Sequence, residues 1–180
     1  MTERNSVTMP ARAGRFFKRS GAAAVALAGM LGMAGEDVAF AAGPFEGMSG
    51  SWTGSGTVSM STGTKERITC KAQYVTKEDG NNFQQALRCQ SASYKFEINA
   101  YVDHNGGSLS GYWTELINNV RGGVSGRASG DSVQARLSGT GFAADLMLRT
   151  RGTSQSVVIT PSADTNTQVQ KVAITLRKRS

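Results

Sequence analysis

The chain has 180 residues, with 22 glycines, three prolines, one histidine and a formal net charge of +7. This length leaves room for one domain, and the composition is globular, which excludes a low-complexity or fibrous protein. Five basic residues lie within the first 20 positions, so residues 42–180 carry 15 basic and 10 acidic side chains and a net charge of only +5.

Residues 1–41 have the order of a secretory signal peptide. A basic region ends at Arg19, an apolar run of small residues follows at 21–35, and Ala39-Phe40-Ala41 forms a small-residue cleavage site. The apolar run is shorter than the roughly 20 residues of a membrane span, so a membrane anchor is the disfavoured alternative. We expect an exported protein, periplasmic or secreted, with a short linker at 42–49 and a barrel domain at 50–180.

From residue 50 onward the chain alternates apolar and polar residues in ten segments, each separated from the next by a turn signal. No helical pattern competes with them. The predicted strands cover residues 50–60, 65–78, 81–91, 94–103, 108–117, 120–129, 132–139, 142–150, 153–160 and 169–178.

The first clear hairpin combines turn chemistry with alternation. Asp79-Gly80 as a two-residue turn places Cys70 opposite Cys89 on a mainly apolar face, with polar residues on the other face. Directly opposed strand residues lie close enough for a disulfide. An exported protein is in a compartment where such a bond persists, so we predict a Cys70–Cys89 bridge. The alternative is a pair of buried free thiols.

The same reasoning assigns the later turns to Asn105-Gly106, Asn118-Asn119, Gly130-Asp131, Thr140-Gly141 and Arg151-Gly152. Each turn keeps one apolar face, which includes Ile98, Trp113, Val124 and Leu137. The opposed pairs that these turns predict are Ile98–Trp113, Phe96–Glu115, Trp113–Val124, Val124–Leu137, Ala135–Leu146 and Leu146–Val157.

A meander of this length must hide both its apolar face and its edges, and closure into a barrel does both. We therefore predict an all-β fold, a single antiparallel up-and-down (meander) β-barrel of about ten strands, in which the strand of Trp52 pairs with the strand of Leu176. A two-sheet sandwich is the alternative. The outward positions are rich in Arg, Lys, Glu and Asn, which argues against an outer-membrane barrel.

The predicted interior mixes large rings with glycines and alanines, so it either encloses a ligand cavity or is filled by its own rings. Two carboxylates, Glu66 and Glu115, lie toward the end that carries the loop 161–168. Glu115 is predicted to hold the polar head of a ligand, or else to bond a tyrosine hydroxyl or water. The candidate ligand-binding residues are Trp52, Tyr74, Tyr94, Phe96, Trp113 and Glu115.

No catalytic constellation is visible. His104 is the single histidine and lies beside a turn, where a solvated turn residue is the ordinary interpretation. The two cysteines do not have zinc-type spacing, and the Gly-x-Gly segments lie inside strands. We therefore expect no enzyme activity, no metal and no cofactor. Outward Arg121, Arg127, Arg136 and Arg149 form a stripe that is either a solvated wall or a weak contact for anionic envelope components, with nucleic acid disfavoured by export.

Gly50-Ser51-Trp52 on the first strand and Arg177 on the last resemble the lipocalin and calycin pattern. Residues 66–70 and 87–89 also resemble an uncharacterised family of exported alphaproteobacterial proteins. The calycin resemblance implies a barrel that binds a small hydrophobic molecule. Ten strands is the number of the fatty-acid-binding branch, but the absence of a helical lid argues against that branch. The predicted function is the binding of a small, largely apolar ligand in the barrel interior. The alternative is an envelope protein-interaction module, an inhibitor or adaptor, with a filled core.

Overall fold

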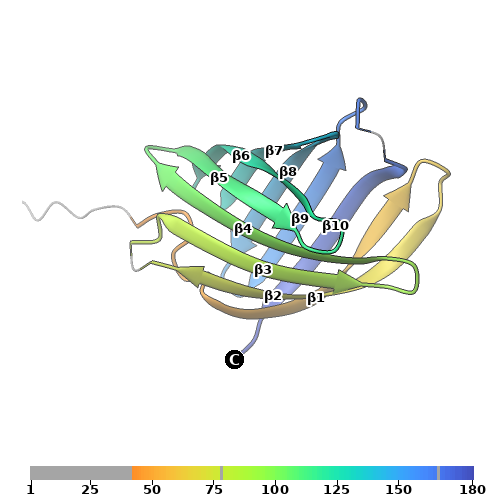
Figure 1. Cartoon of the computed structure of the whole chain (residues 1–180). Helices are drawn as coiled ribbons and strands as arrows, with labels where there is room; N and C mark the ends of the chain where they lie inside the picture. Colours follow the sequence, from red (N-terminus) through yellow and green to blue (C-terminus); the bar gives the residue numbers. More distant parts are fainter. Residues whose placement is uncertain (1–41, 78, 166) are drawn as a thin grey trace, which may run out of the picture. The chain divides into compact units, whose positions relative to one another are not determined.

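The computed structural model describes residues 42–77, 79–165 and 167–180, and within them the regular structure is entirely β (Figure 1). The predicted signal peptide, residues 1–41, lies outside the described residues. The strands are β1 (Gly50–Met60), β2 (Lys65–Thr76), β3 (Asn82–Gln90), β4 (Lys95–Asn105), β5 (Ser108–Glu115), β6 (Val120–Ser129), β7 (Ser132–Gly139), β8 (Phe142–Arg151), β9 (Ser154–Pro161) and β10 (Val169–Lys178).

The ten strands form one closed antiparallel barrel in which each strand pairs with its neighbours in sequence and β10 closes on β1. The predicted barrel is therefore confirmed, and the sandwich alternative is wrong. At the seam Gly54 pairs with Leu176, and a Cβ at Gly54 would collide with the backbone oxygen of Thr175. A glycine is needed there because the two backbones approach closely.

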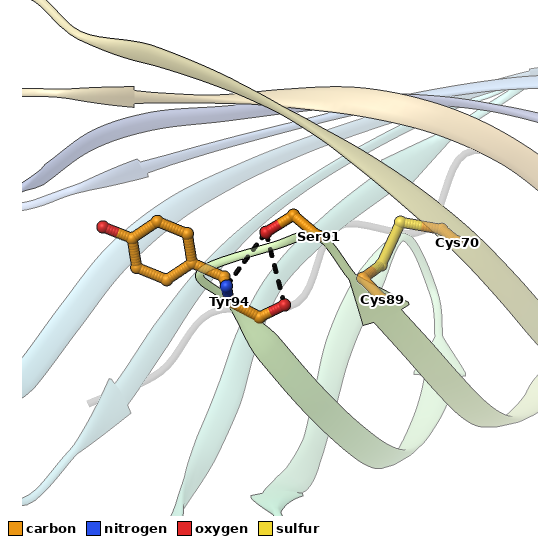
Figure 2. Close-up of a disulfide and its surroundings, with 4 residues drawn as sticks. All are labelled: Cys70, Cys89, Ser91 and Tyr94. Carbon is orange, nitrogen blue, oxygen red and sulfur yellow. Dashed lines mark hydrogen bonds between the residues drawn. A yellow bond between two sulfur atoms is a disulfide. The ribbon is translucent and has the colours of Figure 1, made fainter.

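Three hairpins have the predicted register. Cys70 faces Cys89 between β2 and β3, and the predicted pairs between β6 and β7 and between β7 and β8 are observed. Cys70 and Cys89 are joined by a disulfide with a Cα–Cα distance of 4.1 Å, and both are buried. Figure 2 shows this bridge beside the turn in which the Tyr94 backbone bonds the Ser91 hydroxyl.

Three other hairpins are shifted by two residues from the prediction. Trp113 faces Ala100 and Gly122, in place of Ile98 and Val124, and Glu115 faces Ile98 and Val120, in place of Phe96. Leu146 faces Ile159, in place of Val157. A shift of two keeps every side chain on its face, because side chains alternate with a period of two.

The turns explain the shifts. The β4–β5 turn is Gly106-Gly107, with φ of +56° and +86°, and a type I′ hairpin turn needs positive φ at both central residues. Asn105-Gly106 would meet the same need, but the observed strand pairing places the turn one residue later. The β5–β6 turn has four residues, 116–119, with Asn119 at φ +54°. The β8–β9 turn is Gly152-Thr153, so Gly152, with φ +54°, is its first residue.

Residues 42–49, which the sequence predicts as a linker, pack across one end of the barrel (Figure 1). The backbone N–H groups of Gly43 and Phe45 donate to the oxygens of Asp79 and Gly80 in the β2–β3 turn. Phe45 and Met48 are almost completely buried. We call this end, which also carries the β4–β5, β6–β7 and β8–β9 turns, the capped end.

Candidate functional site

The barrel encloses a cavity of about 150 Å³. Ile98, Trp113, Val124 and Leu137, the four residues predicted to share one dry surface, all line it. Aliphatic side chains of β3 to β10 make up most of the rest of the wall. Among the residues that line the cavity, Gln85 carries a carboxamide and none is charged. The cavity therefore suits an apolar, uncharged guest.

Aromatic rings fill the barrel between the cavity and the capped end. Phe45 stacks on Phe83 with ring centroids 5.0 Å apart, Phe83 contacts Tyr74 at 5.0 Å, and Tyr74 contacts Trp52 at 5.7 Å. Trp52 donates its indole N–H to the Met48 oxygen. These rings form a floor, so the capped end is closed.

The floor is held by one buried polar chain. The Tyr74 hydroxyl donates to Oε1 of Gln155 over 2.7 Å, and Nε2 of Gln155 donates to the Thr150 hydroxyl. Burial raises the pKa of Tyr74 well above its usual range. Tyr74 therefore stays a neutral donor at any ordinary pH, and Gln155 satisfies it without a ligand.

The opposite end of the barrel is open to solvent. Apolar inward residues that are only partly buried lie in the half of the barrel farther from the cap, whereas their counterparts near the cap, such as Val102 and Leu176, are buried. Leu116 and Ile117 of the β5–β6 turn, about half exposed, stand at the same end. We call this end the mouth. The partly buried set is Tyr94, Phe96, Ile98, Val120, Leu137, Phe142, Leu146, Ile159, Val169 and Val172.

Trp113 lies in the wall between mouth and floor. Its ring meets Phe142 edge-on, with centroids 5.4 Å apart, and a Cβ at Gly139 would lie 3.2 Å from the Trp113 Cζ2 atom. The missing side chain at Gly139 therefore leaves room for the indole. Among the described residues, the buried Nε1 of Trp113 has no hydrogen-bond partner. Buried donors are usually satisfied, so this unpaired N–H is an exception in a residue that also lines the cavity.

Glu115 holds the β5–β6 turn at the mouth. Its Oε1 accepts from the backbone N–H groups of Glu97 and Ile117, both at 3.1 Å, and its Oε2 accepts from the backbone and side-chain N–H groups of Asn118 at 2.6 and 2.9 Å. Burial raises the pKa of Glu115, but these four bonds outweigh it, so the net pKa is below the ordinary value. Four donors already occupy the carboxylate that the sequence assigns to a ligand head.

Glu66 acts similarly at the β3–β4 turn. Its Oε1 accepts from the backbone N–H of Ser93 at 2.9 Å, and the Ser91 hydroxyl and this N–H together hold its pKa below the ordinary value. The neighbouring Tyr94 hydroxyl contacts Met60 Sδ at 3.4 Å. As predicted, the two carboxylates lie at the same end of the barrel, where each fixes one turn of the mouth.

The six predicted ligand-binding residues thus occupy three levels. Trp52 and Tyr74 belong to the floor, Trp113 lines the cavity, and Tyr94, Phe96 and Glu115 lie at the mouth. Two contributors were missed by sequence reasoning. Gln85 has inward parity, which the alternation of β3 already contains, and Phe45 is an apolar residue inside the stretch taken as a linker.

His104 is a structural residue of the β4–β5 turn. Its Nε2 accepts from the backbone N–H of Gly107, so its Nδ1 carries the proton and donates to Oδ1 of Asn81 at 2.7 Å. Over the described ranges no cluster of three or more His, Cys, Asp or Glu side chains is placed to hold a metal. Within the same residues no helix is long and apolar enough to cross a membrane.

No protein-family model matches the chain, and no curated protein matches its sequence. Two solved structures are similar in fold. Rv2717c from M. tuberculosis has a TM-score of 0.58 at 14% identity, over 76% of this chain and 94% of that one. The S-type phycobiliprotein lyase CPES from Guillardia theta has a TM-score of 0.49 at 10% identity, over 76% and 90%. The likeness to Rv2717c concerns the fold alone.

Proposed function

We propose that this protein is an exported, non-enzymatic barrel that binds a small, largely apolar ligand in its interior. The observation that carries the proposal is an apolar cavity of about 150 Å³ that is closed by the floor at one end and bordered by partly exposed apolar residues at the other. A dry apolar cavity of this size accepts a guest the size of benzene. The ligand is then smaller than a typical drug-sized molecule, whose pockets begin near about 300 Å³.

The disulfide supports an address outside the cytoplasm, because such bonds persist in oxidising compartments. Together with the signal-like residues 1–41, it favours the periplasm or the cell exterior. The site needs no metal or cofactor, since apolar contact supplies the binding free energy.

Binding is tested by filling the cavity. Ala135 is buried in the wall, and Ala135→Leu adds an aliphatic side chain to the cavity, whereas Gln134→Leu adds the same side chain to the exposed outer face of the same strand. Toluene binding is measured by tryptophan fluorescence. Native mass spectrometry measures the binding of a panel of small apolar compounds. We expect binding to the wild type and to Gln134→Leu and at least tenfold weaker binding to Ala135→Leu. Equal binding by all three proteins, or by none, would refute an interior site.

One observation favours the interaction-module alternative. Tyr101 of β4 and Tyr112 of β5 stack on the outer wall with ring centroids 4.9 Å apart, and Tyr112 is 55% exposed. Exposed tyrosines are typical anchors of protein interfaces.

In the outward arginine stripe, Arg136 pairs with Asp145 and Arg149 pairs with Asp131, so part of the positive charge of the stripe is already neutralised within the protein. This reduces the weight of a purely electrostatic contact.

A further inference from the structure

Gln85 of β3 is an inward residue near the floor that keeps exposed surface. Along its strand it lies between Phe83 and Leu87, which are 5% and 7% exposed. Across the sheet it faces Tyr74 and Ala100, which are 1% and 9% exposed. Gln85 itself is only partly buried. An inward side chain with buried neighbours on all four sides can be exposed only toward the barrel interior, and Gln85 does line the cavity.

The carboxamide of Gln85 has no partner within the protein. Over the residues that the structure describes, no hydrogen bond joins it to another group, whereas the carboxamide of the inward Gln155 accepts from the Tyr74 hydroxyl. The Gln85 nitrogen and oxygen are also not sealed off, because the buried unpaired side-chain atoms in the same part of the chain belong to Trp113 and Ser162. The carboxamide is therefore accessible to a guest in the cavity.

The chemistry of a carboxamide restricts the guest that it binds best. It presents an NH₂ donor and a carbonyl acceptor side by side. A guest that bonds only one of them leaves the other without water in an apolar cavity, which is costly. A lactam has its own N–H and C=O on the same side of the ring, so it meets both groups in either orientation of the carboxamide. An ionic guest would find no counter-ion, since no lining residue is charged.

The position of Gln85 also orients the guest. The β2–β3 turn lies at the capped end, so β3 runs from the floor toward the mouth, and Gln85 directly follows the level of Phe83. The carboxamide is thus at the inner end of the cavity, and the wall between it and the mouth is apolar, with Leu87 and Ile98 among its residues. A guest enters with its polar edge first and packs its hydrocarbon part against this wall.

We infer that the ligand is a neutral compound of about one ring, with a lactam-like edge that bonds the Gln85 carboxamide through one N–H and one C=O. Gln85 is then the residue that determines specificity. This rests on the proposed function, since it names the class of molecule that the same cavity takes.

The experiment compares three guests of similar ring size, δ-valerolactam, cyclohexanone and methylenecyclohexane, in the wild type and in Gln85→Leu. Water solvates them differently, so the measured quantity is the dissociation constant of each polar guest divided by that of methylenecyclohexane in the same protein. We expect Gln85→Leu to raise this ratio at least about tenfold for the lactam and about three- to fivefold for the ketone, which bonds only the NH₂ group. The matched control Gln84→Leu lies on the exposed outer face of β3 and should leave both ratios unchanged.

A second measurement uses the wild type. The side-chain NH₂ signals of Gln85 in the ¹⁵N–¹H spectrum are identified by their loss in Gln85→Leu. With δ-valerolactam bound, one of these protons should lie downfield of its position in the methylenecyclohexane complex, because it donates to the lactam oxygen. Gln85→Met removes the same carboxamide with an unbranched side chain and should repeat the affinity result, which guards against a folding defect of Gln85→Leu.

The outcomes separate the two proposals. Binding of all three guests with the same ratios in wild type, Gln85→Leu and Gln85→Met would overturn the inference and leave the apolar cavity as a binding site. An NH₂ signal at the same position in the lactam and hydrocarbon complexes, or an equal change of the ratios in Gln84→Leu, would also overturn it. Absence of any binding would overturn the inference and the proposed function together.

Discussion

Glu115 offers the sharpest test of how the mouth is built. In Glu115→Gln an NH₂ group replaces one of the two oxygens, and each oxygen accepts two N–H donors. In either orientation of the amide, two N–H donors of the turn meet the new NH₂ group, which cannot accept a hydrogen bond. The other two bonds go to a neutral oxygen and lose their ionic character. Hydrogen bonds to charged groups contribute about 1.5–3 kcal/mol each and neutral ones about 1, so we expect a loss of about 2–4 kcal/mol at pH 7 after the turn relaxes.

The assay is urea unfolding as a function of pH. Because folding lowers the pKa of Glu115 below its ordinary value of 4.5, its stabilisation is complete above that value and is lost as the pH falls through the pKa of the folded state. The gap between wild type and Glu115→Gln should therefore narrow in acid. Asp145→Asn, which breaks the exposed pair with Arg136, is the matched control and should cost no more than about 1 kcal/mol. A loss as small as that of the control, or a gap that does not change with pH, would refute the reasoning.

Three further predictions concern stability. Removing the disulfide with Cys70→Ala and Cys89→Ala should cost about 3 kcal/mol for a bridge with a sequence separation of 19, measured by denaturant unfolding against the wild type with and without reductant. Phe45→Ala should cost about 3 kcal/mol and speed hydrogen exchange at Gly43 and Phe45, whose amides donate to the β2–β3 turn, whereas Glu46→Ala at an exposed neighbour should do neither. Gly106→Val should lower the stability measured by thermal unfolding by about 1–2 kcal/mol, because φ is +56° at this position. No atom lies near enough to crowd a side chain there, so the cost comes from the backbone alone. Gly106→Asn should be tolerated, and equal effects of the two substitutions would argue against the assigned turn.

The inner face of the barrel could be predicted because it depends only on alternation. Ile98, Trp113, Val124 and Leu137 line one cavity although two of the turns that link them are displaced from the prediction. An error of two residues in a turn preserves parity, so the face survives while the opposed pairs change. Fold class and strand bounds are therefore robust, and register is not.

The turns themselves needed information that a local pattern lacks. Gly106-Gly107 and Asn105-Gly106 both satisfy turn chemistry, and only the pairing of whole strands selects between them. At residues 116–119 the deciding interaction is the Glu115 carboxylate, which reaches forward to Ile117 and Asn118. A buried acid was visible in the sequence, but three of its four donors are backbone N–H groups, which carry no sequence signal.

The candidate site was predicted at the level of residue type more than of position. Large inward rings were taken as lining residues, yet the structure uses Trp52 and Tyr74 to close one end. Whether an inward ring closes the barrel or borders the cavity depends on its neighbours. Tyr74 contacts Phe83 and bonds Gln155, whereas Trp113 lies beside Gly139 and faces Gly122. These neighbours are set by closure of the whole sheet.

The pairing of β1 with β10 has a practical consequence for handling the protein. Trp52 faces Lys178, and the Arg179 N–H donates to the Ser51 oxygen, so residue 42 and the last residue both leave the barrel on the side away from the mouth. A purification tag or fluorescent fusion joined after residue 180 therefore projects from the far side of the entrance. Copies immobilised on a sensor chip through that point keep their openings directed toward the flowing sample.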